Sequence, residues 1–231
     1  MTTSTNIAVI IPAYNEENAV GKVVVALPKE LLKTIVVVNN NSNDQTAVVA
    51  QEAGAIVLNE PQQGYGFACL KGIEYLKNLA QQPDIVVFID ADYSDHPEEL
   101  PKLVAPILER DVAMVIGSRA LGAKERGSMT PQQVFGNWLA TKLIKWLYGV
   151  TFTDLGPFRA IQYKSLLALN MQDQTYGWTV EMQVKAAKQG MKVEEVPVSY
   201  RVRVGQSKIS GTIKGTILAG YKIITTIFKY R

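Results

Sequence analysis

The sequence predicts a single α/β domain with a mostly parallel sheet flanked by helices and an amphipathic helix at the C-terminus. The 231 residues are 47% hydrophobic and 19% charged, which is enough for one sizeable core. Short β-branched runs alternate with segments of helical periodicity. We see no linker, repeat or low-complexity segment that would divide the chain. We therefore expect one domain over residues 1–211, followed by a helix over residues 212–231.

In the first half, five apolar runs are predicted to be strands: residues 6–11, 34–38, 55–58, 85–89 and 113–117. The segments between them carry helix-start signals. Glu16 and Glu17 open one helix, Asp44 caps a second that runs to residue 53, and Pro97 occupies the first turn of another. The sequence Gly64-Tyr65-Gly66 leads into a helix through residue 76, and as a phosphate-binding signal it is weak, so a close-packed turn is expected.

The second half is less regular. Residues 131–148 are predicted to be a helix with an apolar face that includes Phe135 and Trp138, together with Leu139 and Leu143. Residues 154–159 form a loop containing Gly-Pro, residues 179–189 a helix and residues 193–200 a strand. The spacing does not say how these elements join the sheet.

The net charge of +3 conceals an asymmetry. Residues 200–231 carry seven basic residues and no acidic one, which leaves 17 basic against 21 acidic residues elsewhere. A basic tail on a mildly acidic body suggests a phosphate-rich ligand or an anionic surface. Nucleic acid is not expected as a partner, because no reader motif accompanies the basic residues. One cysteine, Cys69, excludes an internal disulfide and indicates a reducing compartment.

The segment before residue 7 has no signal-peptide pattern, and no uninterrupted apolar run reaches the length of a membrane-spanning helix. These features predict a cytoplasmic protein. The tail adds the alternative of peripheral attachment to the cytoplasmic face of a membrane, because a basic amphipathic helix suits an anionic bilayer. The competing interpretation is a terminal helix docked on the protein's own core.

A pair of carboxylates, Asp90 and Asp92, follows the fourth predicted strand directly. Because the side chains of a strand alternate with a period of two, we expect both carboxylates to project to the same side. Two hard oxygen donors at the tip of a buried strand suit Mg²⁺ or Mn²⁺, with a phosphate completing the coordination shell. The alternative is a solvated turn at a strand end.

The loops that follow parallel strands open at one edge of a sheet, where ligands bind. We therefore expect residues 12–17, 39–44 and 90–95 to surround a single crevice. Four segments in the chain resemble family-2 glycosyltransferases of GT-A fold, and in particular the dolichyl- or polyprenyl-phosphate mannose and glucose synthases. They are residues 11–17 (IPAYNEE), 39–46 (NNNSNDQT), 90–97 (DADYSDHP) and 200–208 (YRVRVGQSK). Residues 117–119 and 154–159 are similar to two further family segments.

The resemblance implies a role for each matching position. Asp92 would hold the metal, with Asp90 and Ser94 as further metal-side ligands. Phosphates would be held by Arg201, Ser207 and Lys208, with Arg201 and Lys208 counted among the catalytic residues. The remaining donor-binding positions would be Pro12, Ala13, Tyr14, Glu16, Asn40, Asp90, Ala91 and Arg119, the last of which would also lie near the acceptor.

Two departures from the family pattern change what is expected. Relatives usually have Asp-Asp-Gly-Ser where this chain has Asn39-Asn40-Asn41-Ser42. A neutral amide at Asn40 matches the donor and acceptors of uracil better than the paired donors of guanine, which favours a UDP-sugar over GDP-mannose. The spacing from Asp154 to Arg159 is one residue shorter than usual, so no role is assigned to Arg159.

The acceptor decides whether the reaction needs a base. A hydroxyl acceptor must lose a proton, and Glu181 or Asp154 would then be the general base, although Glu181 could equally be a surface residue. A lipid phosphate is already ionised. The same openness applies to Arg203, which alternates with valines and is as consistent with a solvated strand face as with phosphate binding.

The sequence thus predicts an inverting, metal-dependent hexosyltransferase that moves a sugar from a nucleotide donor to a polyprenyl or dolichyl phosphate at the cytoplasmic membrane face. One alternative keeps the donor and uses a soluble hydroxyl acceptor. Another is a non-catalytic protein that binds nucleotide sugars. A second copy of the chain is an additional candidate partner.

Overall fold

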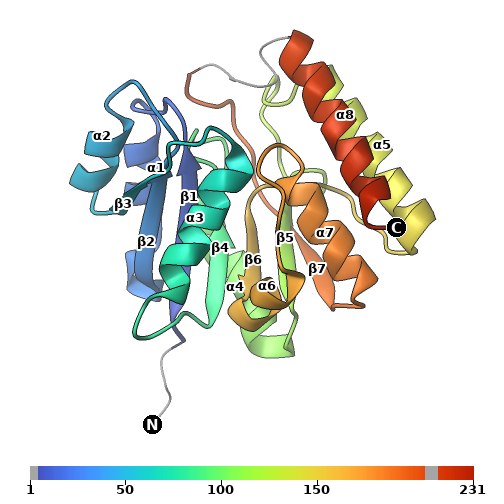
Figure 1. Cartoon of the computed structure of the whole chain (residues 1–231), viewed down its shortest axis with the longest axis horizontal. Helices are drawn as coiled ribbons and strands as arrows, with labels where there is room; N and C mark the ends of the chain where they lie inside the picture. The colour runs from blue at the N-terminus through green and yellow to red at the C-terminus, as the bar shows by residue number, and fades with distance from the viewer. Residues whose placement is uncertain (1–4, 206–212) are drawn as a thin grey trace.

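The structure is a computed structural model and describes residues 5–205 and 213–231. Within these residues one sheet runs in the order β3-β2-β1-β4-β6-β5-β7 (Figure 1). All neighbouring strands pair in parallel except β6, which is antiparallel to both β4 and β5. The strands are β1 (Ile7–Ala13), β2 (Leu32–Asn39), β3 (Ile56–Asn59), β4 (Ile85–Phe88), β5 (Met114–Ser118), β6 (Arg159–Gln162) and β7 (Val193–Pro197).

Helices cover both faces of this sheet (Figure 1). The helices are α1 (Val20–Ala26), α2 (Thr46–Glu52), α3 (Tyr65–Lys77), α4 (Leu100–Arg110), α5 (Pro131–Tyr148), α6 (Tyr163–Leu169), α7 (Trp178–Lys188) and α8 (Ile213–Lys229), with short 3₁₀ turns at η1 (Lys29–Leu31) and η2 (Pro97–Glu99). The expected α/β architecture with a mostly parallel sheet is therefore confirmed.

The alternation of side chains along the strands divides the core into two layers. Along β1, Ala8 and Ile10 face the layer that contains α3, α5, α7 and α8. Val9 and Ile11 face the other layer, which contains α1 and α4. Because both faces are covered, the central strands are apolar throughout, which explains why they read as continuous β-branched runs.

Two elements of the second half were not predicted, β6 and α6. Strand β6 inserts between β4 and β5, so the fourth and fifth strands of the chain are not neighbours in the sheet. Its partners are far away in sequence, with Ile85 opposite Gln162 and Met114 opposite Ile161. A four-residue strand paired over such distances leaves no local pattern for sequence reasoning to detect.

The bounds of α5 agree with the sequence, but its buried face does not. Thr130 accepts a hydrogen bond from the backbone N–H of Gln133 at the first turn, and Gly149 at φ 73° ends the helix. The side chains turned into the core are Ala140 and Ile144, whereas Phe135 and Trp138 are 60% and 53% exposed. The helix is apolar nearly all the way round, so its periodicity could not select the inner side.

Helix α8 lies beside α5 and also contacts α7 (Figure 1). Ile227 and Thr226 are buried in this contact, and the Tyr148 hydroxyl of α5 donates to the Ile227 carbonyl at 2.6 Å. The opposite side of α8 exposes Leu218, Tyr221, Ile224 and Phe228 to solvent. The tail therefore docks on the core with one side and presents an apolar stripe with the other.

Candidate functional site

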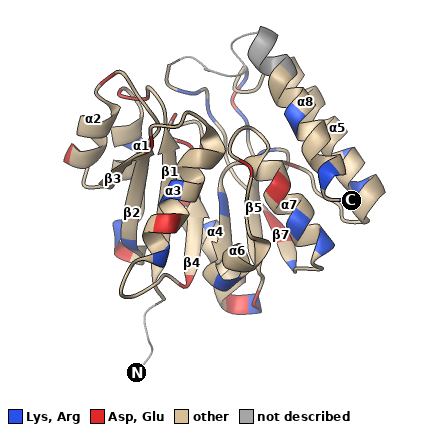
Figure 2. Cartoon of the chain, in the orientation of Figure 1, with Lys and Arg blue, Asp and Glu red and all other residues tan. Residues whose placement is uncertain are grey.

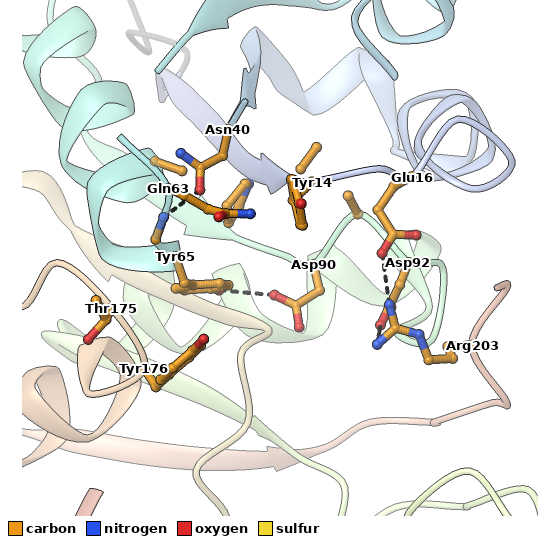
Figure 3. A pocket seen from close by; sticks show the side chains of 15 residues that line it. Tyr14, Glu16, Asn40, Gln63, Tyr65, Asp90, Asp92, Thr175, Tyr176 and Arg203 are labelled. Atoms are coloured by element: carbon orange, nitrogen blue, oxygen red, sulfur yellow. Dashed lines mark hydrogen bonds and ion pairs between the residues drawn. The ribbon is translucent and has the colours of Figure 1, made fainter. Parts of the chain in front are cut away.

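A cavity of about 470 Å³ opens at the C-terminal ends of β1, β2 and β4 (Figure 3). The three loops expected to share a crevice all reach it. The lining residues from these loops are Pro12, Ala13, Tyr14, Glu16, Asn40, Asp90, Ala91 and Asp92, and further walls come from Gln63, Gly64, Tyr65, Ala68, Thr175, Tyr176 and Arg203. We call this the first cavity.

Asp90 and Asp92 both line the first cavity, although for a reason other than the one expected. Strand β4 ends at Phe88, and the pair lies in the turn that follows, where Tyr93 adopts a left-handed φ of 61°. The turn, and not the strand period, brings both carboxylates to one side. A pair held in this way depends on the turn's backbone conformation.

The Asp90 carboxylate accepts a hydrogen bond from the Tyr65 hydroxyl at 3.0 Å (Figure 3). Burial, together with the negative charge of Asp92, raises the pKa of Asp90 to about 6. Burial and the nearby Asp90 also raise the pKa of Tyr65 well above its usual value, so the phenol remains a donor. The negative charges of Asp90 and Asp92 repel each other, and a bound cation would relieve that repulsion.

Asp92 is held from two sides. Its Oδ1 accepts hydrogen bonds from the backbone N–H of Ser94 at 2.9 Å and from the Ser94 hydroxyl at 2.5 Å. Its Oδ2 lies 3.2 Å from Nη1 of Arg203, whose Nη2 donates to Glu16 at 2.8 Å (Figure 3). Ser94 is fully buried behind Asp92, so in this structure it orients a metal-ligand candidate and does not itself face the cavity.

The residues present fit a divalent cation. In the part of the chain that the structure describes, no three His, Cys, Asp or Glu side chains come together as a self-sufficient metal centre. Asp90 and Asp92 would therefore need further oxygen donors from a ligand, as is common for Mg²⁺. The guanidinium of Arg203 already lies against Asp92, which shows that a positive charge is accommodated at this point.

Residues 8–169 match Glycosyl transferase family 2. This chain belongs to that family. It is 37% identical over 221 residues to an uncharacterized glycosyltransferase of Mycobacterium tuberculosis, covering 92% of this chain and 94% of that one. It is 29% identical to a dolichyl-phosphate hexose transferase of Haloferax volcanii, covering 98% and 96%, and 28% identical to an undecaprenyl-phosphate mannosyltransferase of Micrococcus luteus, covering 89% and 88%.

Among solved structures, the glycosyltransferase resembles glucosyl-3-phosphoglycerate synthase of Mycobacterium tuberculosis, which was crystallised with Mn²⁺, UDP and phosphoglyceric acid. The TM-score is 0.77 at 22% identity, covering 98% of this chain and 78% of that one. The likeness establishes the GT-A fold. The family match and the glycosyltransferase relatives confirm that the chain is a nucleotide-sugar-dependent hexosyltransferase.

The basic residues of the glycosyltransferase are distributed differently from what the resemblance implied. Arg203, which the sequence left open, lines the first cavity. The guanidinium of Arg201 stacks on the Tyr93 ring at 3.7 Å and donates to the Asp95 carbonyl at 3.0 Å. Two other phosphate-binding candidates, Ser207 and Lys208, lie outside the described residues.

Asn40 lines the first cavity, but its amide is engaged by the protein. Its Nδ2 donates to the carbonyls of Glu60 at 3.2 Å and Gln62 at 2.7 Å, and its Oδ1 accepts from the Gly64 N–H at 2.7 Å. Both amide hydrogens are therefore used to hold residues 60–64. The expected reading of a base by the Asn40 amide does not fit this arrangement, because the donor half has no hydrogen left to offer.

The first cavity also has a wall that sequence reasoning missed, made by Thr175 and Tyr176. This loop packs tightly on the turn at Gly64-Tyr65-Gly66, as the close-packed interpretation of that turn required. A Cβ on Gly66 would lie 1.9 Å from the Asp173 carbonyl oxygen, and one on Gly64 would lie 2.3 Å from that of Gln174. The sequence of residues 170–177 carries no motif that would have indicated a ligand wall.

The two base candidates are both engaged. Glu181 is fully buried and accepts from the N–H groups of Gln172 and Asp173, the Tyr230 hydroxyl at 2.7 Å and the Lys185 ammonium at 2.7 Å. It is not among the residues that line the first cavity.

Asp154 forms a bidentate pair with Arg119, whose Nε and Nη2 donate at 2.8 and 2.7 Å. The pairing raises the pKa of Arg119 against the opposing effect of its burial. Arg119 also lies over the Tyr200 ring at 5.0 Å and is not among the residues that line the first cavity. The contact of Arg119 with the donor stays a prediction, and its guanidinium is held by Asp154.

A second cavity of about 290 Å³ lies between the loop after β5 and the N-terminal half of α5. Its polar lining includes Lys124, Asn137, Thr153 and Asp154, and its apolar lining includes Trp138. Because β4 and β5 point the same way, the two cavities open at the same edge of the sheet, two strands apart.

No helix within residues 5–205 and 213–231 combines the length and apolarity needed to cross a bilayer.

Proposed function

We propose that the protein is an inverting, divalent-metal-dependent glycosyltransferase that moves a hexose from a nucleotide donor to a polyprenyl or dolichyl phosphate at the cytoplasmic face of a membrane. The nucleotide sugar occupies the first cavity. The acceptor phosphate approaches from the second cavity, and its hydrocarbon chain leaves along α5 and α8. The observation that carries this choice of acceptor is the exposed apolar side of α5 and α8.

In the first cavity, Pro12, Ala13 and Tyr14 would flank the base and ribose, with Asn40 holding the wall behind them. Asp90 and Asp92 would bind Mg²⁺ or Mn²⁺ together with the donor diphosphate. The cation supplies charge neutralisation for the leaving diphosphate. UDP is the leading nucleotide because glucosyl-3-phosphoglycerate synthase, which has the same fold, was crystallised with it. The Asn40 amide does not add to that argument, and GDP-mannose stays an alternative.

During transfer, the bond between the anomeric carbon and the diphosphate oxygen breaks, and a bond from that carbon to an acceptor phosphate oxygen forms on the opposite side. Negative charge accumulates on the departing nucleoside diphosphate. Arg203 lines the cavity in contact with Asp92 and can turn toward this charge. Lys208 and Ser207 follow it in the chain and are candidates for the same task, and Arg201 would support the turn through Tyr93.

An ionised acceptor agrees with the state of the carboxylates. A hydroxyl acceptor would require a base, yet Glu181 holds four donors and Asp154 is paired with Arg119. Freeing either would break charge-assisted hydrogen bonds in a buried setting, which is costly. A phosphate monoester needs no proton removed, so position and charge alone can suffice.

The exposed side chains of α5 and α8 form what we call the outer face: Phe135, Trp138, Trp146, Leu218, Tyr221 and Phe228. Trp146 is 71% exposed and Tyr221 69% exposed. Neither helix contains an acidic residue (Figure 2). Both contain lysines, including Lys142 and Lys145 on α5 and Lys229 on α8. Exposed aromatics with lysines and no carboxylates are typical of surfaces that bind anionic bilayers.

Two relatives act on lipid phosphates by name, the undecaprenyl-phosphate mannosyltransferase and the dolichyl-phosphate hexose transferase. The second cavity would receive such a head group, with Lys124 beside the phosphate and Trp138 at the start of the hydrocarbon path. The acceptor would then be held at the end of the outer face.

The decisive experiment supplies radiolabelled UDP-glucose, UDP-galactose or GDP-mannose together with membrane lipid extract and Mn²⁺. We expect label to enter the solvent-extractable lipid, with a product mass equal to a polyprenyl phosphate plus one hexosyl residue, that is, a hexose less one water. Label that appears only in water-soluble products would reject the lipid acceptor.

Membrane attachment is tested separately by flotation with phosphatidylglycerol vesicles. We expect the double variant Trp146→Ser/Phe228→Ser to float at least about 10-fold less than the wild type, since each change removes a large apolar contact. The matched control is Val25→Ser/Val48→Ser, which alters exposed valines on α1 and α2 at the other end of the sheet. Equal flotation of all three proteins would reject the outer face as the membrane contact, and self-association of the wild type alone would identify a second copy as its occupant.

A soluble acceptor is the second candidate. It is favoured by the fold likeness to glucosyl-3-phosphoglycerate synthase, which was crystallised with a phosphorylated three-carbon acid. The same radiolabel experiment, with phosphoglyceric acid in place of lipid, measures it directly. A non-catalytic role in nucleotide-sugar binding would be excluded by any metal-dependent transfer that Asp92→Asn abolishes.

A further inference from the structure

The loop formed by residues 172–177, which we call the wall loop, joins α6 to α7 and brings Thr175 and Tyr176 to the first cavity (Figure 3). Two buried carboxylates fix its backbone. Glu181 accepts from the N–H groups of Gln172 and Asp173, at 3.0 and 2.6 Å. Asp173 in turn uses Oδ1 to accept from the N–H groups of Thr175 and Gly177, at 2.8 and 3.0 Å. Hydrogen bonds from four N–H groups therefore define the path of the wall loop.

Each of these carboxylates is also bound by α8 or by the residue that follows it. The Lys222 ammonium lies 3.0 Å from Oδ2 of Asp173, and the Tyr230 hydroxyl donates to Oε1 of Glu181 at 2.7 Å. Lys222 and Tyr230 are eight residues apart, about two helical turns, so the helix meets the two carboxylates at two points along its length. The side chain of Lys185 adds a third contact, because its ammonium pairs with Glu181 and lies 4.8 Å from the Tyr230 ring centre.

The wall loop is closely packed against its neighbours on two sides. On the side of α8, a Cβ on Gly177 would lie 2.6 Å from Oγ1 of Thr226. On the side of α3, a Cβ on Gly66 would overlap the Asp173 carbonyl, and the Phe67 N–H donates to the Gln174 carbonyl at 3.0 Å. The wall loop is therefore pressed between the C-terminal helix and the start of α3, where Tyr65 contacts Asp90.

We propose that Lys222 and Tyr230 are positioning residues for the donor, which act through Asp173 and Glu181 to set Thr175 and Tyr176 in the wall of the first cavity. The inference rests on the proposed function in taking the first cavity as the donor site. It gives Glu181 a role at the reaction without contact with the substrate. It also connects the outer side of α8, which we assign to the membrane, with the donor through the inner side of the same helix.

The first test does not depend on the donor. Amide hydrogen exchange is measured on the free protein for the wild type and for Lys222→Met/Tyr230→Phe. The reporters are the four amides of Gln172, Asp173, Thr175 and Gly177. We expect their exchange to accelerate by about 5- to 30-fold, as the loss of one or two hydrogen bonds implies, while amides in β1 and β4 stay unchanged. Unchanged exchange at all four amides would overturn the proposal.

The second test measures the donor. Binding of UDP with Mn²⁺ is titrated calorimetrically, and the KM for the nucleotide sugar is measured where transfer is detected. We expect the double variant to bind UDP about 5- to 10-fold more weakly, with a matching rise in donor KM. The kcat should change by less than about 2-fold, because the substitutions alter the wall that binds the donor and leave the reacting groups in place. The single variant Lys222→Arg keeps the positive charge beside Asp173 and should therefore retain most of the wild-type affinity for UDP.

The matched controls are Tyr75→Phe on α3 and Lys188→Met on α7, which remove the same groups away from the wall loop. Thermal unfolding of every variant checks that the chain is folded. A double variant that binds UDP as tightly as the wild type would overturn the proposal, whereas a wild type that binds neither UDP nor GDP would overturn the proposed function and leave the exchange experiment to decide the role of α8.

Discussion

The two halves of the sheet form their cavities in different ways. In β3-β2-β1-β4, parallel strands end at one edge and the loops after β1, β2 and β4 meet there, so the first cavity follows from the topology. In β6-β5-β7, an antiparallel strand interrupts the order, and the second cavity is closed by α5 packed beside the loop after β5. A regular half holds the acidic pair, and an irregular half holds the contacts that we assign to the acceptor.

The charged groups of the two cavities come from different segments of the chain. The charged groups of the first cavity are Glu16, Asp90, Asp92 and Arg203, and their geometry depends on loops from the regular half together with the segment after β7. The charged residues that line the second cavity are Lys124 and Asp154, which come from the irregular half, and Asp154 is paired with Arg119. Changes to the charged groups of the first cavity should therefore alter donor binding, and changes to those of the second cavity should alter acceptor binding. Substitutions in each half test that division.

The largest effect is expected at Asp92. Asp92→Asn keeps the shape of the side chain and removes the charge that would hold the cation, so transfer should fall by on the order of 10²–10³-fold. The measurement is sugar transfer at saturating Mn²⁺, with circular dichroism to verify folding. The exposed Glu52→Gln on α2 is the matched control and should retain full activity. Loss of activity in both would mean that global charge, and not the site, is responsible.

The next effect separates two arginines. Arg203→Met removes the guanidinium that contacts Asp92 and Glu16, and we expect donor affinity to fall by about 10- to 100-fold, as for other charge-assisted contacts. Arg201→Met removes a residue stacked on Tyr93 outside the cavity, and we expect a smaller loss. Isothermal titration with UDP and Mn²⁺ compares them. The reverse order would return the phosphate role to Arg201.

A smaller effect is expected in the irregular half. Lys124→Met should raise the acceptor KM by about 5- to 10-fold while the donor KM changes by less than about 2-fold, because the lysine lines the second cavity and not the first. Steady-state kinetics with each substrate varied in turn gives both constants. Equal changes in the two constants would show that the halves are coupled and that the division is wrong.

The smallest effect concerns stability and pH. Burial and Asp92 raise the pKa of Asp90 from 3.8 to about 6, so the folded protein binds the Asp90 proton more tightly than the unfolded chain does. The stability that Asp90 contributes is therefore complete below pH 3.8 and is lost as the pH rises through about 6. In EDTA, Asp90→Asn should melt about 2–4 °C above the wild type at pH 8, if roughly 1 kcal/mol is relieved, and the gap should narrow at pH 5.

The protonation of Asp90 also predicts how metal binding depends on pH. Because the cation needs the carboxylate form of Asp90, Mn²⁺-dependent binding of UDP should weaken as the pH falls through about 6. A melting gap that is constant between pH 5 and pH 8 would contradict the assigned pKa shift.

The regular half was predictable because its signals are local. The runs that became β1, β2, β3 and β4 are apolar and β-branched, and their polar ends face one edge by topology alone, so Tyr14, Asn40 and Asp92 could be assigned to one cavity from their order in the chain. Even there, side-chain details escaped. The Asn40 amide forms hydrogen bonds with the backbone of residues 60–64, and the spacing of residues in the sequence does not predict this tertiary contact.

The irregular half was less predictable because its residues are positioned by distant contacts. The sequence made Glu181 a candidate general base on a helix. In the structure its carboxylate accepts hydrogen bonds from residues 172, 173 and 230 and pairs with the ammonium of Lys185. Trp138 fitted an inner apolar face but lies on the outside, since α5 is apolar on nearly every side. Arg203 could not be distinguished from a solvated residue until the segment after β7 was seen to cross the first cavity.

The insertion of β6 has a consequence for how the chain acquires its structure. Strands β3, β2, β1 and β4 come from residues 7–88 and can pair as soon as that part of the chain is synthesised. Strand β5, completed at residue 118, has no place beside β4 until residues 159–162 arrive to bridge them. Pairings of such long sequence separation form slowly. The donor half of the sheet therefore has the means to assemble first, and the last join of the sheet waits for a strand of only four residues.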